Sequence, residues 1–323
     1  MRFVIYGAGA IGGVVGARLH QSGHDVALIA RGEHLRRIRS QGLTLQTPVE
    51  RSVLELPVAE DPEQLGVGAD EDVILLAVKG QDTRGALAAL REAGTPASTP
   101  IVCLQNGVEN ERLALRIFAH VYGAVIMLPA AHLEPGVVLA YGAKATGTVD
   151  IGRYPTGRDD LCEQVAGAFR VSQLSSHVWP DVMRLKYAKL ILNLGNAVEA
   201  LCGPGEASDE LTEQARAEGR AALVAAGIDA EDANVDDLEG RWERLGVGEI
   251  QGSPRAGSSS WQSLARGTGE IETDFLNGEI VLLGRLHGVP TPINAALTEL
   301  AERQARAGTP PGAMTIQDIL AVV

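Results

Sequence analysis

The chain has 323 residues, of which 28 are Lys or Arg and 41 are Asp or Glu, so its formal net charge is −13. This acidic balance disfavours binding to nucleic acid or to an anionic membrane surface, because both partners are negatively charged. The length suggests two domains, and a hydrophobic content of 45% is enough for substantial cores.

The three cysteines, Cys103, Cys162 and Cys202, are far apart and show no metal-ligand spacing. We interpret them as buried small side chains in a reducing compartment and expect no metal site. The N-terminus does not resemble a signal peptide, and no apolar run approaches the roughly 18 residues needed to cross a membrane. A cytoplasmic location is therefore expected.

The first half of the chain alternates short apolar runs with amphipathic segments. Strands are expected at residues 3–6, 26–30, 73–78, 100–104 and 124–128, and helices at 10–22 and 33–40. Continuous apolar strands that alternate with helices indicate a parallel sheet covered on both faces. The predicted fold class is α/β, with an N-terminal, doubly wound parallel sheet of Rossmann type.

The pattern changes after about residue 131. Residues 137–141 and 146–152 are expected to be strands without an intervening helix, which favours an antiparallel extension. After about residue 177 the strand signals end, and helices are expected at 182–201, 212–226, 271–286 and 294–307.

We therefore predict a Rossmann domain at residues 1–176 and an all-helical domain at residues 177–323. The Gly/Ser-rich stretch 252–260 interrupts the helical domain and is a candidate mobile loop.

A glycine-rich turn follows the first expected strand and opens the first expected helix. Its sequence is Gly7-Ala8-Gly9-Ala10-Ile11-Gly12, a GxGxxG pattern. In this context Gly7 permits the tight turn, Gly9 lets the backbone approach a pyrophosphate, and Gly12 lets helix and strand pack closely. The helix N-terminus then offers N–H groups to the anion. The turn predicts dinucleotide binding, with a purely structural glycine turn as the alternative.

Arg31 lies where the second expected strand ends, nineteen residues after Gly12. NAD enzymes usually carry an acidic residue here for the ribose 2′-OH, whereas a guanidinium can pair with a 2′-phosphate. NADPH is therefore the expected cofactor. The alternative is that Arg31 is a solvated surface residue.

Lys79 and Asn106 follow two further expected strands. The carboxyl ends of parallel strands are where open α/β sheets bind ligands. The Asn106 amide can offer a donor and an acceptor to a carboxamide or a substrate oxygen. The alternatives are an ordinary Asn-Gly turn and a lysine that solvates a strand end.

Lys189, Asn193 and Asn196 share one face of the expected helix 182–201. At about 100° per residue, Asn193 lies about 40° from Lys189 and Asn196 about 20° on the other side. Polar groups on an otherwise apolar face are costly unless they are paired. A partly desolvated lysine there is a candidate general acid. Lys186 projects about 60° from Lys189, so the spacing leaves it open as the acid. The alternative is a solvated face, or asparagines satisfied within a helix bundle.

Glu272 falls among apolar residues at the start of the expected helix 271–286, and three serines, Ser258 to Ser260, precede Trp261. The carboxylate could orient a lysine and bind a ribose or substrate hydroxyl. The alternatives are a helix-start acid stabilised by the helix dipole and a flexible polar loop.

The chain resembles the ketopantoate reductase (2-dehydropantoate 2-reductase) family over nearly all of its length. The matching pieces are Gly7 to Gly12, Arg31, Lys79, Asn106-Gly107, Pro135-Gly136, Lys189-Leu190 with Asn193, Ser258-Ser259 with Gln262, Glu272 with Asn277-Gly278, and Pro290 with Asn294. The family joins a Rossmann domain to a helical domain. The resemblance implies NADPH-dependent reduction of a small 2-keto acid, 2-dehydropantoate, to (R)-pantoate, in the route to pantothenate and coenzyme A.

The resemblance also implies roles for individual residues. Lys189 is the expected general acid, and Glu272 is its expected partner near the cofactor. The expected cofactor ligands are Gly7, Ala8, Gly9, Ala10, Ile11, Gly12, Arg31, Lys79, Asn106 and Glu272. The expected substrate ligands are Asn106, Lys189, Asn193, Asn196 and one of Ser259 and Ser260. Matching Gln262 to the family's glutamine favours Ser259, whereas counting back from Glu272 gives Ser260, so both are kept.

The departures from the family pattern cluster around the substrate. Ala197 stands where the family has a second helix asparagine, and Asn196 stands one position early. Ser263 replaces the usual Asp, Tyr187 replaces the usual Trp, and Trp261 suggests a reshaped apolar wall. A family relative that reduces another branched or larger, aromatic-bearing 2-keto acid therefore stays open.

A protein of another class also stays open, a non-catalytic NADPH-binding regulator that kept the glycine turn. Such a regulator would not need Lys189 together with Asn193 and Glu272. The oligomeric state is open as well, with a homodimer as one alternative.

Overall fold

The computed structural model describes residues 1–230, 245–255 and 257–323. The chain divides into two compact units, the first formed by Met1–Lys186 with residues 245–255, and the second by residues 187–230 and 257–323. Within these described ranges, no helix is both long enough and apolar enough to span a membrane.

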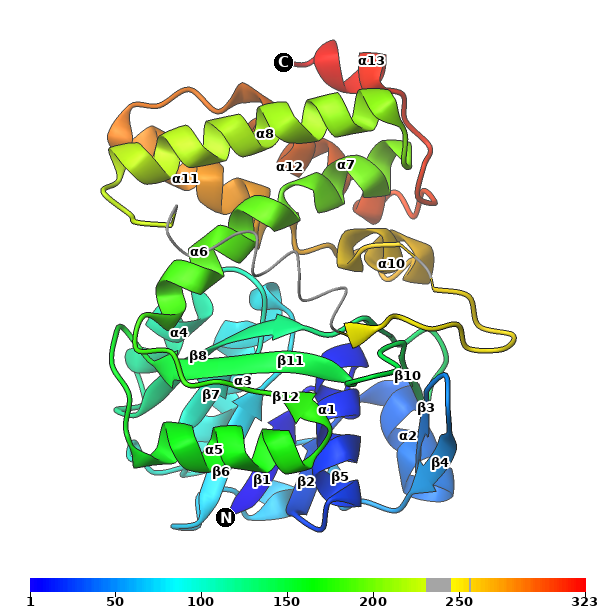
Figure 1. The fold of residues 1–323 in the computed structure, drawn as a ribbon, viewed down its shortest axis with the longest axis vertical. Coiled ribbons are helices and arrows are strands. Elements are labelled where there is room, and N and C mark those ends of the chain that lie inside the picture. The colour runs from blue at the N-terminus through cyan, green and yellow to red at the C-terminus, as the bar shows by residue number, and fades with distance from the viewer. Residues whose placement is uncertain (231–244, 256) are drawn as a thin grey trace. The chain divides into compact units, whose positions relative to one another are not determined.

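The first unit is built on an eight-stranded sheet in the order β12-β11-β8-β7-β6-β1-β2-β5 (Figure 1). The strands are β1 (Arg2–Tyr6), β2 (Asp25–Ile29), β5 (Val58–Ala59), β6 (Asp72–Leu76), β7 (Ile101–Cys103), β8 (Val121–Met127), β11 (Gly147–Arg153) and β12 (Leu174–Ser175). All pairs from β8 to β5 are parallel, and β11 is antiparallel to β8. The expected Rossmann-type sheet is confirmed, and so is its antiparallel extension by β11.

Helices cover both faces of this sheet. They are α1 (Ala10–Gln21), α2 (Gly32–Gln41), α3 (Thr83–Glu92), α4 (Asn110–Leu115) and α5 (Asp160–Val171), with short 3₁₀ turns η1 (Glu63–Leu65) and η2 (Gly80–Asp82). Phe3 and Ile5 of β1 share a core with α1, α2 and α5, whereas Val4 shares a core with α3 and α4. A strand buried on both faces explains why β1 is apolar at successive positions.

A second, four-stranded sheet has the order β4-β3-β10-β9. Its strands are β3 (Leu43–Gln46), β4 (Arg51–Leu54), β9 (Ala130–Ala131) and β10 (Val137–Ala140). The expectation that residues 137–141 extend the main sheet is therefore wrong. The β3–β4 hairpin supplies a parallel partner for β10 instead, because β3 pairs with β10 along Thr44 to Gln46.

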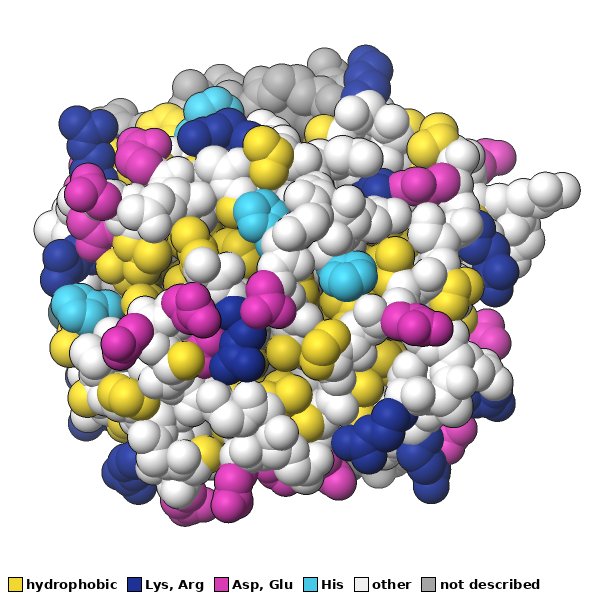
Figure 2. Space-filling view, turned by 90° about the horizontal axis from the view of Figure 1, so that it is seen from below, with side chains coloured by type: hydrophobic (Ala, Val, Ile, Leu, Met, Phe, Trp, Pro, Cys, Tyr) yellow, Lys and Arg dark blue, Asp and Glu magenta, His cyan; other side chains and the backbone are white. Residues whose placement is uncertain are grey.

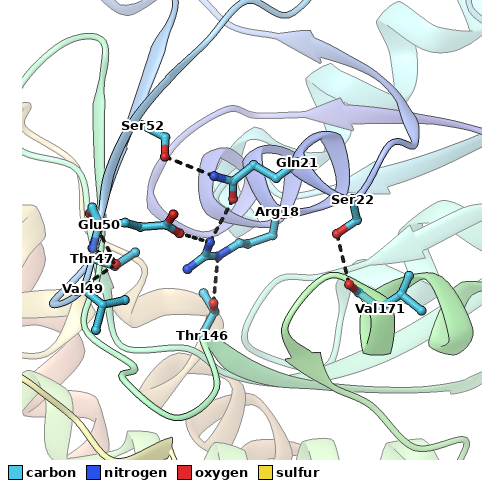
Figure 3. Close-up of polar contacts among 9 residues, drawn as sticks. All are labelled: Arg18, Gln21, Ser22, Thr47, Val49, Glu50, Ser52, Thr146 and Val171. Atoms are coloured by element: carbon cyan, nitrogen blue, oxygen red, sulfur yellow. Dashed lines mark hydrogen bonds and ion pairs between the residues drawn. The ribbon is translucent and has the colours of Figure 1, made fainter.

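Arg18 of α1 joins the small sheet to the start of β11 through polar contacts (Figure 3). Its Nε donates to Thr146 Oγ1 at 2.9 Å. Its Nη1 contacts Glu50 in the β3–β4 turn and donates to Gln21 Oε1 at 2.9 Å. The Arg18 side chain is only 3% exposed, so these acceptors compensate a charge that is almost fully removed from water. They hold α1, the helix that begins at the glycine turn, against the hairpin.

Acidic and basic side chains are interspersed on the face drawn in Figure 2, where Lys and Arg side chains stand among Asp and Glu side chains. Glu33 pairs with two of the three arginines in the basic cluster of α2. It contacts Arg36 Nη2 at 2.6 Å and Arg37 Nε at 3.2 Å.

The second unit is a helical bundle. Besides the C-terminal part of α6 (Val182–Asn193), which begins in the first unit, it contains α7 (Gly195–Cys202), α8 (Glu206–Ala225), α10 (Ser259–Arg266), η3 (Thr273–Phe275), α11 (Asn277–His287), α12 (Pro292–Arg306) and α13 (Ile316–Leu320). Every regular element among the described residues of this unit is helical, which confirms the expected helical C-terminal region.

The single helix expected at residues 182–201 is in fact two helices that meet at Leu194. The Leu194 carbonyl accepts a hydrogen bond from Asn277 Nδ2 at 3.1 Å, which gives this carbonyl a partner outside its own helix. A Cβ at Gly195 would lie 2.6 Å from Thr212 Cγ2 of α8, so the glycine permits a close approach of α7 to α8. The expectation of one continuous helix is wrong: the Leu194 backbone keeps helical angles, φ −61° and ψ −28°, but its N–H bonds the Ile191 carbonyl at 3.3 Å, as in a 3₁₀ turn.

Candidate functional site

Four sets of predicted ligands lie at one edge of the main sheet. β1 leads into the glycine turn, β2 into Arg31, β6 into Lys79 and β7 into Asn106. The four strands are parallel and adjacent in the order β7-β6-β1-β2. Their carboxyl ends therefore meet at the same edge, where open α/β sheets bind ligands.

The glycine turn has the geometry that its pattern predicts. Gly7 has φ +106°, and a Cβ there would lie 2.8 Å from Val78 N. A Cβ at Gly12 would lie 2.0 Å from Gly7 O and 2.9 Å from Ile5 Cγ2. Gly7 thus permits the turn beside the end of β6, and Gly12 lets α1 pack directly on β1.

Gly9 differs from its neighbours, because the fold itself does not require a glycine there. Its backbone has φ −70° and ψ −156°, which other residues adopt, and a Cβ would meet nothing within 4 Å. No side chain caps the α1 N-terminus at this residue, and the first turn of α1 contains no acidic residue. The open space and the N–H groups of the helix start fit a bound pyrophosphate.

Arg31 is an exposed side chain at the start of α2. The Arg31 side chain is 74% exposed, and its Nη2 atom lies 3.4 Å from Asp82 Oδ2. Burial raises the pKa of the nearby Tyr6, with Asp61 raising it further and Arg31 lowering it. An exposed guanidinium in a weak ion pair remains able to bind a phosphate.

The turns that carry Lys79 and Asn106 are held through their backbone carbonyls. The Lys79 carbonyl accepts the Asp82 N–H at 2.9 Å. The Asn106 carbonyl accepts Asn110 Nδ2 at 3.0 Å. Both predicted ligands are half-buried, so their side chains lie at the surface of the sheet edge.

His34 of α2 contacts the glycine turn, and sequence reasoning missed it. Its Nδ1 accepts the Gly136 N–H at 2.9 Å, so the proton of the neutral ring is on Nε2, which donates to Ala8 O at 2.7 Å. The rings of His34 and His132 lie 4.1 Å apart. Burial, together with His132, lowers the pKa of His34 to about 4. The only signal in the sequence was a histidine close behind Arg31.

Lys186 is one of the two lysines that the helical spacing left open as a general acid. Its Nζ contacts Glu111 Oε1 and donates to the Gln105 carbonyl at 3.0 Å. The Lys186 side chain is 3% exposed and that of Glu111 is 0% exposed. Because its ammonium group is held by two buried acceptors, Lys186 is part of the core of the first unit.

In the second unit, Lys189 lies in α6, and Asn193 is the last residue of that helix. Asn196 is the second residue of α7. The expected common face therefore crosses the break at Leu194. Asn193 Nδ2 is buried and has no hydrogen-bond partner among the described residues.

The three serines lie at the start of α10. Ser258 is the N-cap, and its Oγ accepts the Trp261 N–H and donates to the Asn196 carbonyl, each at 3.4 Å. Ser259 is exposed, whereas Ser260 is buried and its Oγ has no hydrogen-bond partner in the described part of the chain. The stretch expected to be a mobile loop, residues 252–260, thus ends in the first two residues of α10, and its residue 256 lies outside the described residues.

Glu272 precedes η3, because the helix expected at residues 271–286 is split into η3 and α11. Burial lowers the pKa of Arg266, and the Glu272 carboxylate partly offsets this effect, so the two charges are neighbours. Glu272 is half-buried.

A Rossmann-type sheet with candidate ligand groups at its carboxyl edge is typical of dinucleotide-binding proteins. The family profile described as "Ketopantoate reductase PanE/ApbA" matches residues 3–156, and that of the family's C-terminal domain matches residues 181–305. The chain therefore belongs to the ketopantoate reductase family, which consists of nicotinamide-dependent oxidoreductases.

The chain is also similar to individual members of this family. It is 31% identical to a 2-dehydropantoate 2-reductase of Halobacterium salinarum, in a match that covers 95% of this chain and 100% of the relative. It is 28% identical to one of Pyrococcus horikoshii, in a match that covers 95% of this chain and 99% of the relative. A ketopantoate reductase structure from Ralstonia eutropha superposes with a TM-score of 0.80 at 29% identity, over 95% of this chain and 99% of that one. A D-mandelate dehydrogenase complex with NADH and anilino(oxo)acetate has the same fold, with a TM-score of 0.80 at 24% identity over 95% and 99% of the chains.

The two glycines Gly9 and Gly12 should respond differently to alanine. Gly9→Ala should weaken dinucleotide binding about 10- to 100-fold and leave the melting temperature unchanged, because its Cβ fills space that only a ligand would use. Gly12→Ala should lower the unfolding free energy by about 1–3 kcal/mol, because its Cβ meets backbone. Fluorescence titration and thermal melting measure the two effects. A destabilised Gly9→Ala protein would contradict the assignment.

His34 should make folding stability depend on pH. Its pKa is about 4 in the folded protein and about 6.5 in an unfolded chain, so the unfolded state binds more protons between these values. The stability contributed by neutral His34 is present above pH 6.5 and is lost as the pH falls toward 4. The unfolding free energy of the natural protein minus that of His34→Gln should therefore shrink over this range. Urea unfolding at several pH values measures it, with His287→Gln as the control. A difference that does not vary with pH would show that His34 is not held neutral.

Proposed function

We propose that the protein reduces 2-dehydropantoate to (R)-pantoate with NADPH, in the cytoplasm. The observation that carries this proposal is the meeting of the glycine turn, Arg31, Lys79 and Asn106 at one sheet edge of a ketopantoate reductase family member. The relatives from Halobacterium salinarum and Pyrococcus horikoshii bear the name of this activity and match the chain nearly end to end.

The proposed division of labour follows the two units. The first binds the dinucleotide, with the α1 N-terminus on the pyrophosphate and Arg31 on the 2′-phosphate. The bound cofactor supplies the hydride that reduces the ketone carbon. The second unit supplies a proton for the ketone oxygen and polar contacts for the keto acid.

Lys189 is the proposed general acid. The buried contacts of Lys186 with Glu111 and Gln105 favour Lys189 over Lys186, because they leave the Lys186 ammonium group no access to a substrate. Lys189 is half-buried, and removal from water moves the pKa of a lysine toward that of a useful acid. Glu272 is proposed to keep this ammonium charged and oriented.

The proposed substrate ligands are Asn193, Asn196 and a serine of α10. Two of these groups, Asn193 Nδ2 and Ser260 Oγ, are buried without a partner among the described residues, which costs free energy unless a ligand satisfies them. This supports Ser260 over the exposed Ser259 as the substrate serine. Ser258, the remaining serine, serves as the helix cap.

The direct test is an assay of NADPH consumption with a panel of 2-keto acids. 2-Dehydropantoate should be the best substrate, with kcat/KM at least about tenfold above that of other branched keto acids. Larger and aromatic-bearing keto acids belong in the panel, because Ala197, Ser263 and Trp261 depart from the family pattern near the proposed substrate. If one of these keto acids is turned over better than 2-dehydropantoate, it takes the place of 2-dehydropantoate as the proposed substrate. If none of the keto acids is turned over, the proposal that the protein is an enzyme is contradicted.

Arg31→Ala should weaken NADPH binding much more than NADH binding. The lost charge-assisted hydrogen bond corresponds to roughly 10- to 150-fold in affinity, and only NADPH carries the phosphate. Fluorescence titration with both cofactors measures it, and Arg36→Ala, an exposed arginine of the same helix, is the control. Equal weakening of both cofactors would mean that Arg31 does not bind the 2′-phosphate.

Lys189→Ala should lower kcat by about 10²- to 10⁴-fold while NADPH still binds, as expected for removal of a general acid. Lys189→Arg keeps the charge but does not release a proton readily, so it should preserve KM better than kcat. Steady-state kinetics and NADPH titration separate the two effects. Substantial activity in Lys189→Ala would refute the assignment.

A further inference from the structure

A buried polar network lies directly behind the turn that carries Asn106. Lys186 of α6 and Glu111 of α4 form an ion pair with almost no exposure, and Lys186 Nζ also donates to the Gln105 carbonyl at 3.0 Å. On the other side of the same turn, Asn110 Nδ2 donates to the Asn106 carbonyl at 3.0 Å. Two successive carbonyls of the turn are therefore held by buried side chains.

The network extends to the turn that carries Lys79. Gln105 Nε2 donates to Thr83 Oγ1 at 3.1 Å, and this hydroxyl donates to Asn110 Oδ1 at 2.7 Å. Thr83 is the first residue of α3, which follows the Lys79 turn, and its Oγ1 lies 3.5 Å from the Lys79 carbonyl. Thr83 therefore links the turns after β6 and β7, both of which carry predicted cofactor ligands.

The composition of the network argues against a role in stability alone. Removing a lysine and a glutamate from water costs several kcal/mol per ion, and apolar replacements of such pairs are often neutral or stabilising. Glu111 Oε2 and Gln105 Oε1 are buried with no partner among the described residues, so the network is not even fully satisfied. Burial raises the pKa of Glu111, and Lys186 opposes this shift.

The surrounding strands make room for this pair. A Cβ at Gly123 of β8 would come within 3.3 Å of Glu111 Oε1 and 3.4 Å of Lys186 Cδ. Burial raises the pKa of the Cys103 thiol at the end of β7, the Glu111 charge raises it further, and the Lys186 charge lowers it. The space for a charged pair is thus built into the sheet.

We infer that Lys186 and Glu111 are positioning residues, which fix the Gln105–Asn106 turn so that the Asn106 side chain is held ready for the dinucleotide and the keto acid. This inference rests on the proposed role of Asn106. Lys186 acts through the Gln105 carbonyl and takes no part in proton transfer.

The test is the double variant Lys186→Met/Glu111→Leu, which replaces both charges by apolar side chains and leaves neither charge unpaired. Its melting temperature should be equal to or above that of the natural protein. Its dinucleotide affinity and kcat/KM should nevertheless fall about 10- to 100-fold, because the turn is no longer fixed. Unchanged affinity and unchanged kcat/KM in a folded double variant would overturn the inference.

A thermodynamic cycle distinguishes positioning from general damage. Asn106→Ala should cost much less in the double-variant background than in the natural protein, because the two changes act on the same contact. Arg31→Ala should cost the same fold-change in both backgrounds. Equal costs of Asn106→Ala in the two backgrounds, or no cost in either, would refute the inference.

The control is another ion pair of the same sheet. Arg2 and Asp72 lie at the amino ends of β1 and β6, 2.7 Å apart, with side-chain exposures of 22% and 0%. Arg2→Met/Asp72→Leu should leave dinucleotide affinity and kcat/KM unchanged. The same loss of affinity and activity in this control would show that any lost ion pair damages the site, and would overturn the inference.

If the double variant does not fold, Thr83→Val cuts the network without changing a charge. Thr83→Val should lower dinucleotide affinity and kcat/KM by a smaller factor, about 3- to 10-fold. Unchanged affinity and kcat/KM would overturn the inference. Dinucleotide affinity also separates the two proposals. If no keto acid is turned over, the proposed function fails, and the cycle on dinucleotide affinity still decides the role of Lys186.

Discussion

The candidate dinucleotide site depends on the parallel pairing of β1 with both β2 and β6. Tyr6, the last residue of β1, is level with Ile29 and Leu76, so the three following turns begin at the same height. The ladder continues past the strands, with Gly7 N donating to Ile29 O at 3.1 Å and Ala77 N donating to Tyr6 O at 2.8 Å. A slip of one residue would turn every side chain to the other face and lose both cores.

Much of this arrangement could be predicted because its causes are local in sequence. A strand buried on both faces is apolar at successive positions, and a glycine turn before a helix marks the first crossover. The break at Leu194 was not visible in the helical pattern, and the side chain that bonds the Leu194 carbonyl, Asn277, lies far along the chain. The partner of β10 was missed for the same reason, since its parallel neighbour β3 lies some ninety residues earlier.

The residues predicted as ligands differ in how they act from His34, which was missed, and from Lys186, which the sequence suggested only as a possible acid. Arg31 and Asn106 present side chains at strand ends, and their residue types indicate what they can bind. His34 and Lys186 act on backbone carbonyls, those of Ala8 and Gln105, and a carbonyl is present at every position of a sequence. Helical spacing alone could not tell Lys186 from Lys189, whereas the burial of Lys186 beside Glu111 supports Lys189 as the proposed acid.

The ion pairs Arg2–Asp72 and Lys186–Glu111, at opposite edges of the sheet, differ in whether their buried carboxylate is fully hydrogen-bonded. Asp72 at the amino edge is buried, but Arg2 and the N–H groups of Gly68 and Ala69 more than offset this, so its pKa lies below the ordinary value. That carboxylate is fully satisfied and favours the folded state above acidic pH. Glu111 near the carboxyl edge has a raised pKa and an oxygen that the described residues leave unpaired. An arrangement that costs free energy at the edge of the candidate site is best explained by the turn that it holds in place.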